Sequence, residues 1–150
     1  MLFKPYHIYP MHIGLKTYTR RFWKRPHVKV GGEYDVTHKM MYQPEDVIGF
    51  IQVEDIYRQP LGMITEQDAQ NEGGYNRAAY FDLLKEIVPS TKIGLRLDSM
   101  YVGCYVVKFR FVLSDLIDGN GGDFEIRNYY DLWKDHMKKF GIEVHEYDHS

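Results

Sequence analysis

The sequence is organised around one stretch of eight residues, Gly14-Leu15-Lys16-Thr17-Tyr18-Thr19-Arg20-Arg21. It combines a flexible glycine, a lysine, two threonine hydroxyl groups and a pair of arginines. Its β-branched and aromatic residues, Thr17-Tyr18-Thr19, favour the start of a β-strand over a helix. The stretch therefore predicts a strand that carries cationic and hydroxyl side chains.

The charge around this stretch is strongly asymmetric. The first 32 residues contain seven Lys and Arg residues and no Asp or Glu, and the first acidic residue is Glu33. The rest of the chain carries 12 basic and 21 acidic residues, so a net charge of −2 hides a division into +7 and −9. A local basic field attracts phosphate whatever the overall charge of the protein.

Length and composition indicate one globular domain of 150 residues, 44% hydrophobic and 27% charged. Cys104 is the only cysteine, which excludes an internal disulfide, and its place in an apolar run predicts a buried, unreactive thiol. No apolar run reaches membrane-spanning length, and the N-terminus lacks the apolar region of a secretion signal. We therefore expect a soluble, cytoplasmic protein without a membrane partner.

Short strands and a few helices are predicted, without a regular strand–helix alternation. Strands are expected within residues 17–21, 28–30, 34–38, 47–57, 100–113 and 142–147. Helices are expected before Gly14, after a capping box at 65–68, from Asn76 to about Val88, and over residues 126–140. This order predicts an α+β fold with a small barrel-like sheet.

Lys16 and Thr19 form a candidate catalytic pair. A threonine hydroxyl is a weak nucleophile until a base removes its proton, and a lysine can be that base if its pKa is lowered. Arg20, Arg21 and Lys24 are close enough in sequence to lower it by charge repulsion. Residues three apart in an ideal strand point to opposite faces, so the pair needs a bend in the chain. The residues alone favour an alternative in which Lys16 anchors phosphate and Thr19 is an ordinary strand residue.

A basic and aromatic surface is the second candidate site. Its residues are Arg20, Arg21, Trp23, Lys24 and Arg25, with Lys108 and Arg110 added if their strand lies beside the first one. Guanidinium groups hold phosphate while aromatic rings stack on bases, so this pattern is typical of nucleic-acid binding. A solvated basic face with its rings turned into the core is an equally good interpretation.

Other motifs indicate neither a metal nor a cofactor. The seven histidines lack metal-ligand spacing, and Gly31-Gly32 and residues 119–122 do not precede the Lys-Ser/Thr of a phosphate-binding loop. The last predicted helix carries an aromatic stripe that includes Tyr130, Trp133 and Met137. The stripe is typical of a core face or a dimer contact, and it leaves the oligomeric state open. A protein-interaction adaptor would instead expose it as an apolar patch.

The stretch from Gly14 to Arg21 resembles the G-x-K-T-x-T-x-R signature of ASCH domains, which are members of the PUA-like superfamily. Three later segments are similar to family features in the expected order. They are a turn at 29–34 with Gly32 where Asp is usual, an acidic helix at 65–73 that ends in Glu-Gly, and a closing strand at 105–112. The resemblance predicts an ASCH/PUA-like domain over residues 1–113 and a C-terminal extension, 114–150, that packs on it as an amphipathic helix.

This resemblance implies a small β-barrel with flanking helices and a cleft that holds the signature. Some relatives are amidohydrolases that remove acetyl from N4-acetylcytidine with a Lys, a Thr three residues later and a Glu on the acidic helix. In this sequence these residues are Lys16 as the base, Thr19 as the nucleophile, and Glu72 to orient Lys16 or handle the proton. Other relatives resemble ribonucleases or bind RNA without known chemistry. The implied partner is RNA or a modified nucleoside or nucleotide, and hydrolysis or pure RNA binding both stay open.

Overall fold

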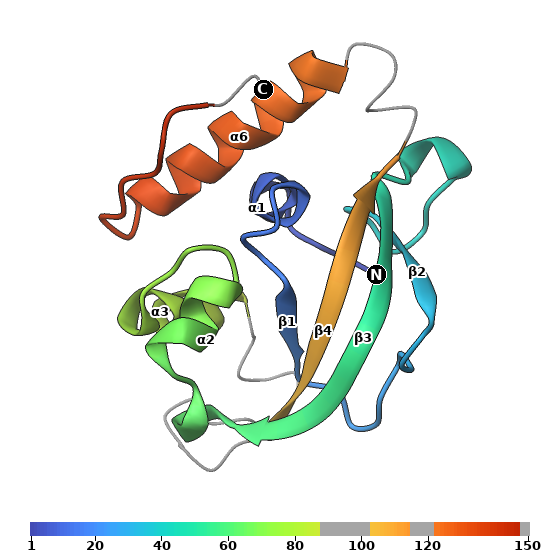
Figure 1. Ribbon diagram of the computed structural model, residues 1–150, viewed down its shortest axis with the longest axis vertical. Helices are drawn as coiled ribbons and strands as arrows, with labels where there is room; N and C mark the ends of the chain where they lie inside the picture. Colours follow the sequence, from blue (N-terminus) through green and yellow to red (C-terminus); the bar gives the residue numbers. More distant parts are fainter. Residues whose placement is uncertain (88–102, 115–121, 148–150) are drawn as a thin grey trace.

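The computed structural model describes residues 1–87, 103–114 and 122–147. Within them the chain forms an open four-stranded sheet in the order β1-β4-β3-β2, with antiparallel neighbours throughout (Figure 1). The strands are β1 (Tyr18–Arg21), β2 (Glu33–Val36), β3 (Gly49–Pro60) and β4 (Gly103–Leu113). The predicted α+β class is confirmed. The predicted barrel is wrong for this part of the chain, because β1 and β2 lie at opposite edges and do not pair.

The long central pair, β3 and β4, carries the middle of the sheet. Ile51, Val53, Val107 and Phe109 alternate with more exposed residues and are buried in one of the two hydrophobic clusters. The register shifts between Val53 and Asp55, where a bulge bends β3. β3 also continues through Pro60, beyond the end that the sequence predicted.

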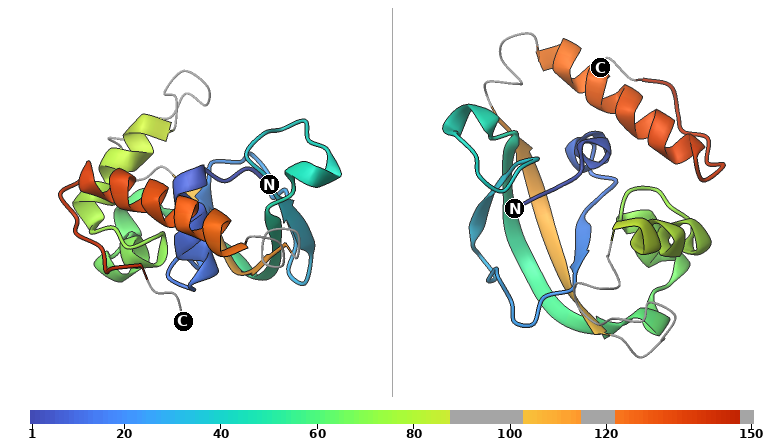
Figure 2. Two further views of the ribbon diagram at one scale, coloured as in Figure 1. Left: turned by 90° about the horizontal axis from the view of Figure 1, so that it is seen from above. Right: turned by 180° about the vertical axis from the view of Figure 1, so that it is seen from behind.

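Helices cover two sides of this sheet. They are α1 (Ile8–His12), α2 (Glu66–Asn71), α3 (Arg77–Ile87) and α6 (Gly122–Lys138), with short 3-10 turns η1 (Pro5–His7), η2 (Pro44–Asp46) and η3 (Leu61–Met63). Figures 1 and 2 show α2 and α3 beside the β1 edge, and α1 between the sheet and α6. The beginning of the chain is therefore enclosed by later elements.

Capping side chains begin α2 and α3 at the residues that the sequence predicted. Thr65 Oγ1 accepts a hydrogen bond from Asp68 N, and an Asp68 carboxylate oxygen accepts one from Thr65 N. Glu72 caps the other end of α2, and Gly73 follows with a φ of 137°. Asn76 Oδ1 accepts a hydrogen bond from Ala79 N at the start of α3. Val88, the predicted end of α3, lies outside the described residues.

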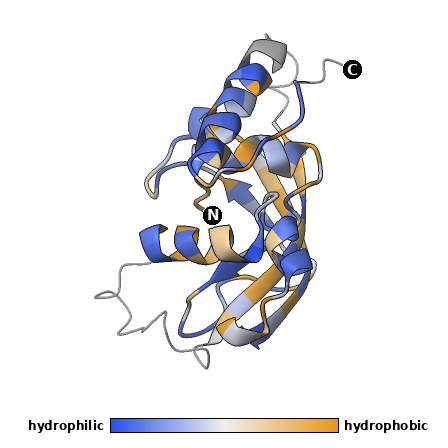
Figure 3. Ribbon diagram, turned by 90° about the vertical axis from the view of Figure 1, so that its left-hand side faces the viewer, coloured by the Kyte–Doolittle hydropathy of each residue, from blue (hydrophilic) through white to orange (hydrophobic). Residues whose placement is uncertain are grey.

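The aromatic stripe of α6 is part of the core. Tyr130, Trp133 and Met137 are buried against Tyr9 and Tyr75. Figure 3 shows mainly hydrophilic residues on the visible outer side of α6 and hydrophobic residues on the strands. The exposed apolar patch that an adaptor would need is therefore absent from this stripe.

Two predicted strands are wrong. Residues 28–30 and 142–147 are irregular, and β2 alone follows the turn at Gly31, whose φ is 83°. In the last segment His145 and Tyr147 pack their rings against Tyr9 and Tyr130, so the segment is held by ring contacts and not by a strand ladder. Residues 100–102 and 119–121 of the expected strand and loop lie outside the described residues. The domain boundary at residue 113 stays a prediction.

Candidate functional site

A cavity of about 500 Å³ lies where β1 meets the N-terminal segment, the end of α2 and helix α3. Its lining residues are Leu2, Phe3, Lys4, Pro5, His7, Lys16, Thr19, Arg20, Arg21, Phe22, His38, Glu72, Tyr80, Leu83 and Ile87. Because β1 is the edge strand of the described sheet, side chains from both of its faces reach the same cavity. The eight-residue stretch thus supplies four of the lining residues.

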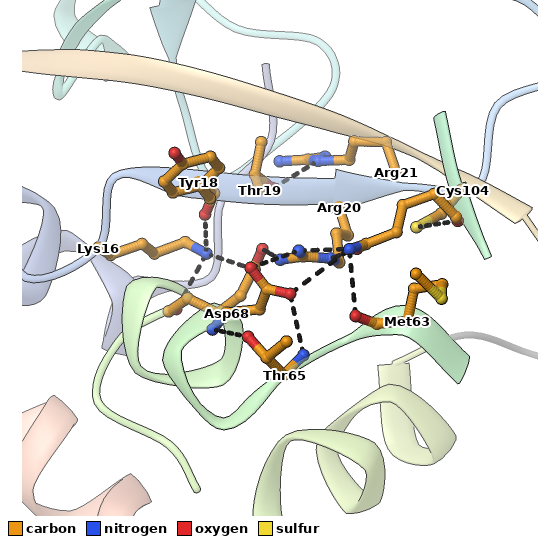
Figure 4. Close-up of polar contacts among 11 residues, drawn as sticks. Lys16, Tyr18, Thr19, Arg20, Arg21, Met63, Thr65, Asp68 and Cys104 are labelled. Atoms are coloured by element: carbon orange, nitrogen blue, oxygen red, sulfur yellow. Dashed lines mark hydrogen bonds and ion pairs between the residues drawn. The ribbon is translucent and has the colours of Figure 1, made fainter. Parts of the chain in front are cut away.

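Glu72 holds two buried cations, one on each carboxylate oxygen. Lys16 Nζ lies 3.0 Å from Oε1, and Arg20 Nη1 lies 2.7 Å from Oε2. Lys16 and Glu72 are each only 2% exposed, and the side chain of Arg20 is fully buried. Asp68 reaches Arg20 Nη2 at 3.5 Å from a more exposed position. Figure 4 shows Lys16 from the segment before β1, Arg20 from β1 and Asp68 from α2 converging.

The ammonium group of Lys16 has a partner for each of its three N–H bonds. Besides the Glu72 carboxylate it donates to Glu72 O at 3.0 Å and to Tyr18 O at 2.9 Å. Burial lowers the pKa of Lys16, the attraction of Glu72 opposes that shift, and Arg21 and Arg20 add to it. A lysine in these surroundings gives up a proton more easily than an exposed one, as a general base requires.

Thr19 is 5% exposed and is bound to a different cation. Arg21 Nε donates a hydrogen bond to Thr19 Oγ1 at 3.1 Å, and Arg21 Nη2 donates to Leu2 O at 2.6 Å. Figure 4 shows Thr19 and Arg21 on the side of β1 away from Lys16 and Arg20. A cationic N–H that points at a hydroxyl oxygen stabilises negative charge that develops on it.

The chain bends before β1, as cooperation between Lys16 and Thr19 requires. Gly14 has a φ of 78°, and Lys16 N donates to Pro10 O at 2.9 Å, which turns the chain back onto α1. Lys16 therefore precedes the strand and lines the same cavity as Thr19. Among the described residues the hydrogen bonds of Lys16 Nζ end on Tyr18 and Glu72, so no direct bond joins it to Thr19.

The remaining predicted ligand-binding residues lie outside the cavity. The Trp23 ring stacks on His27 with centroids 4.6 Å apart, and Lys24 and Arg25 are exposed in the loop after β1. β4 does lie beside β1, but Arg21 pairs with Tyr105 and Tyr18 with Lys108, so Lys108 is at the far end from this loop.

Lys108 and Arg110 have acidic or amide neighbours of their own. Lys108 Nζ lies 3.9 Å from a Glu54 carboxylate oxygen, and Arg110 donates to Gln52 Oε1 at 3.1 Å. At about 3.3 Å per strand residue, Arg110 is roughly 16 Å along β4 from Tyr105. The structure thus splits the predicted basic surface into two separate groups.

Several site residues were missed by the sequence interpretation. Gln59 Oε1 accepts hydrogen bonds from Arg20 Nε and Nη2 at 3.1 and 2.9 Å. Burial, and then the charge of Glu72, raise the pKa of Tyr80 well above its ordinary value, so its hydroxyl stays protonated. Gln59 carries no sequence signal, because only the bulged β3 brings it under Arg20. Tyr80 belongs to an apolar helix face that predicts a core residue.

Two buried histidines flank the hydroxyl group of Tyr75 behind the cavity. His7 Nε2 lies 2.7 Å and His136 Nε2 lies 2.8 Å from Tyr75 Oη. Burial, and then the charge of Lys139, lower the pKa of His136 from 6.5 to about 4. Burial and the nearby Lys16 lower the pKa of His7 well below 6.5. Both imidazoles are therefore neutral at pH 7.

Acid is expected to destabilise the protein through these histidines. Their folded-state pKa values are lowered, so the unfolded chain binds protons first as the pH falls below 6.5. Their contribution is complete above pH 6.5 and declines as the pH falls, for His136 down to its folded-state pKa of about 4. Urea unfolding at several pH values measures the slope of the free energy of unfolding against pH. His136→Gln should flatten it, whereas the same change at exposed His12 should not; equal slopes in all three proteins would contradict the prediction.

Other chemistry is not indicated by the described residues. Within residues 1–87, 103–114 and 122–147 no three His, Cys, Asp or Glu residues lie close enough to hold a metal ion. Burial raises the pKa of the Cys104 thiol to about 11, which keeps it protonated. No helix in the described part of the chain combines the length and the apolar character needed to cross a membrane.

Solved structures with the same architecture identify the fold. The chain is similar to the ASCH domain from Lactobacillus crispatus JV V101, with 14% identity, a TM-score of 0.56, and 70% of this chain matched to 69% of that one. It is also similar to a DUF984 protein from Enterococcus faecalis V583, with 16% identity, a TM-score of 0.50, and 69% matched to 68%. The sequence matches no protein-family model and no curated protein. The chain has the α+β fold of the ASCH-domain structure.

Proposed function

We propose that the cavity binds a modified nucleoside or a nucleotide of RNA and hydrolyses an amide bond on the base, as in N4-acetylcytidine. The observation that carries the proposal is that Lys16, Thr19 and Glu72, all nearly inaccessible to solvent, line one cavity of about 500 Å³. Pockets of a few hundred Å³ suit ligands of this size. Phe3 and Leu83 offer apolar walls for a base, and Arg21 offers a cation.

The proposed reaction begins with attack of Thr19 Oγ1 on the amide carbonyl carbon. Lys16 first releases an ammonium proton to solvent, which its lowered pKa favours. The hydroxyl proton then passes to the resulting amine of Lys16, and the Arg21 Nε–H stabilises the negative charge that develops on Thr19 Oγ1. The C–N bond then breaks, and the leaving amine takes the proton that Lys16 received from Thr19. The acyl group remains on Thr19 as an ester until a water molecule attacks it, which releases the carboxylic acid and restores the Thr19 hydroxyl. Glu72 orients Lys16 throughout. Catalytic hydrogen bonds are often completed only with substrate in place, and the Lys16–Thr19 contact is one of these.

A paired assay tests the proposal. Wild type, Lys16→Ala and Thr19→Val are each incubated with N4-acetylcytidine and, separately, with a short single-stranded RNA, while product and binding are followed. Turnover of the nucleoside that is lost in both variants supports the amidohydrolase. RNA cleavage lost in both moves the proposal to a ribonuclease. Absence of any product with wild type contradicts hydrolysis. Lys134→Ala removes an exposed cation on α6 and is the matched control.

A non-catalytic RNA-binding module is the alternative, and the exposed Lys24 and Arg25 beside Trp23 favour it. It predicts binding without product and an affinity that falls steeply with salt. Lys24→Ala should then weaken RNA binding evenly across sequences and lower the salt slope by about one. Unchanged affinity and slope in this variant would exclude the loop as the binding surface.

A further inference from the structure

A continuous chain of hydrogen bonds connects the cavity with the C-terminal helix. His7 belongs to η1 and lines the cavity, Tyr75 lies between α2 and α3, and His136 belongs to α6. The two links, 2.7 and 2.8 Å, are short enough for proton transfer between neighbours. The middle hydroxyl of Tyr75 is fully buried, and burial raises its pKa so that it stays protonated.

The outer nitrogen of each histidine is accessible. Every fully buried side-chain nitrogen or oxygen in the described residues has a hydrogen-bond partner. The bonds found for His7 and His136 within these residues use Nε2 alone, so each Nδ1 retains contact with solvent or the cavity. The series of hydrogen bonds therefore has an accessible nitrogen at each end, one on His7 in the cavity wall and the other on His136 in α6.

We propose that His7, Tyr75 and His136 form a proton relay, in which His7 Nδ1 exchanges a proton with the bound ligand and His136 Nδ1 exchanges it with solvent. The relay rests on the proposed function for its substrate. It adds His7 to the residues that touch the ligand, and it makes α6, a helix beyond the predicted ASCH domain, part of the working site.

The chemistry of the three groups allows this transfer. Tyr75 has one hydroxyl proton, so it donates to one Nε2 and accepts from the other, and the two histidines must hold opposite tautomers. When His7 Nδ1 takes a proton, the Nε2 proton of His7 moves to Tyr75 Oη. The tyrosine proton moves to His136 Nε2, and the proton on His136 Nδ1 leaves to solvent. Each group gains one proton and loses one, so no charge is left inside.

The surroundings keep both ends neutral between transfers. His7 faces the cations Lys16, Arg21 and Lys4, and also His136. His136 faces Lys139, and its ring stacks on Tyr6 with centroids 3.6 Å apart. The cations near His7 and near His136 make a protonated imidazole unfavourable at either residue. A proton that reaches one of these rings is therefore passed on quickly.

The test compares Tyr75→Phe with a matched variant, Tyr9→Phe. Tyr9 also binds a histidine, His145 at 3.2 Å, but does not line the cavity. In Tyr75→Phe we expect kcat for N4-acetylcytidine to fall at least tenfold with KM unchanged, a shifted pH profile and a smaller solvent isotope effect. Tyr9→Phe should behave like wild type. Added imidazole should restore turnover in His7→Ala, which a merely structural histidine would not show.

Histidine tautomers give a readout that does not depend on activity. Long-range ¹H–¹⁵N spectra of the full chain should show opposite tautomers at His7 and His136, and both should change in Tyr75→Phe but not in Tyr9→Phe. Equal tautomers, or tautomers untouched by Tyr75→Phe, would overturn the relay even if wild type proves inactive. Turnover in wild type with identical kinetics in the two tyrosine variants would overturn the relay and leave the proposed hydrolysis standing.

Discussion

Glu72→Ala is expected to lower the free energy of unfolding by about 3–5 kcal/mol, since it leaves two buried cations without a counter-charge. The carboxylate of Glu72 is the partner of both Lys16 Nζ and Arg20 Nη1, at 3.0 and 2.7 Å. Asp68 reaches only Arg20 and is more exposed, so it cannot replace the lost charge. Urea denaturation followed by circular dichroism measures the effect.

Lys16→Met is the control that isolates the charge argument. It keeps the length of the buried side chain, and it leaves Glu72 still paired with Arg20. Removing Lys16 therefore leaves no buried cation without a counter-charge. We expect the free energy of unfolding to fall by no more than about 1 kcal/mol. Equal destabilisation by the two substitutions would show that the cluster is held by packing and not by the balance of charge.

The second large effect is expected on turnover. Lys16→Met should reduce kcat for the proposed amide hydrolysis by about 10²–10⁴, the usual contribution of a general base. Without Nζ the Thr19 hydroxyl has no amine to take its proton, while Phe3, Arg21 and Leu83 continue to line the ligand cavity. Steady-state kinetics and ligand binding are measured on the same preparation.

The two substitutions, at Glu72 and at Lys16, should therefore affect different properties, although both residues belong to the same ion cluster. Glu72→Ala is expected to unfold readily, whereas Lys16→Met is expected to fold well and to lose turnover. Lys134→Met, a matched lysine change at an exposed position of α6, should alter neither property. Turnover in Lys16→Met within threefold of wild type would remove Lys16 from the proposed mechanism, whereas RNA binding without turnover in wild type would favour the RNA-binding alternative.

The parts of the fold that local chemistry decides were predictable. The capping pair Thr65 and Asp68 predicts the start of α2, and Asn76 predicts the start of α3. Both predictions hold because a capping side chain bonds to backbone only a few residues away. Period-two alternation of apolar residues likewise marks β3 and β4. The errors fall at residues 28–30 and 142–147, where β-branched or aromatic residues occur but no neighbouring strand pairs with them.

The sequence predicted some of the residues that line the cavity, but not their geometry. A resemblance of a short motif pointed to Lys16, Thr19 and Glu72, and all three line the cavity. The sequence interpretation also placed Arg20 on a nucleic-acid surface, whereas the structure buries its side chain between Glu72, Asp68 and Gln59. β1 ends at Arg21, so Arg20 lies on the strand with its side chain buried, whereas Lys24 lies in the exposed loop that follows.

By itself the sequence determined the α+β class, the capped helices and the residue types of the site, since each depends on neighbours within a few positions of the chain. Only the tertiary structure decided that the described sheet stays open, that Glu72 neutralises Lys16 and Arg20 together, and that His136 reaches Tyr75. These contacts join residues that are more than 50 positions apart. Their formation depends on how β1, α2 and α6 pack, and burial then sets the charge states that any chemistry in the cavity must use.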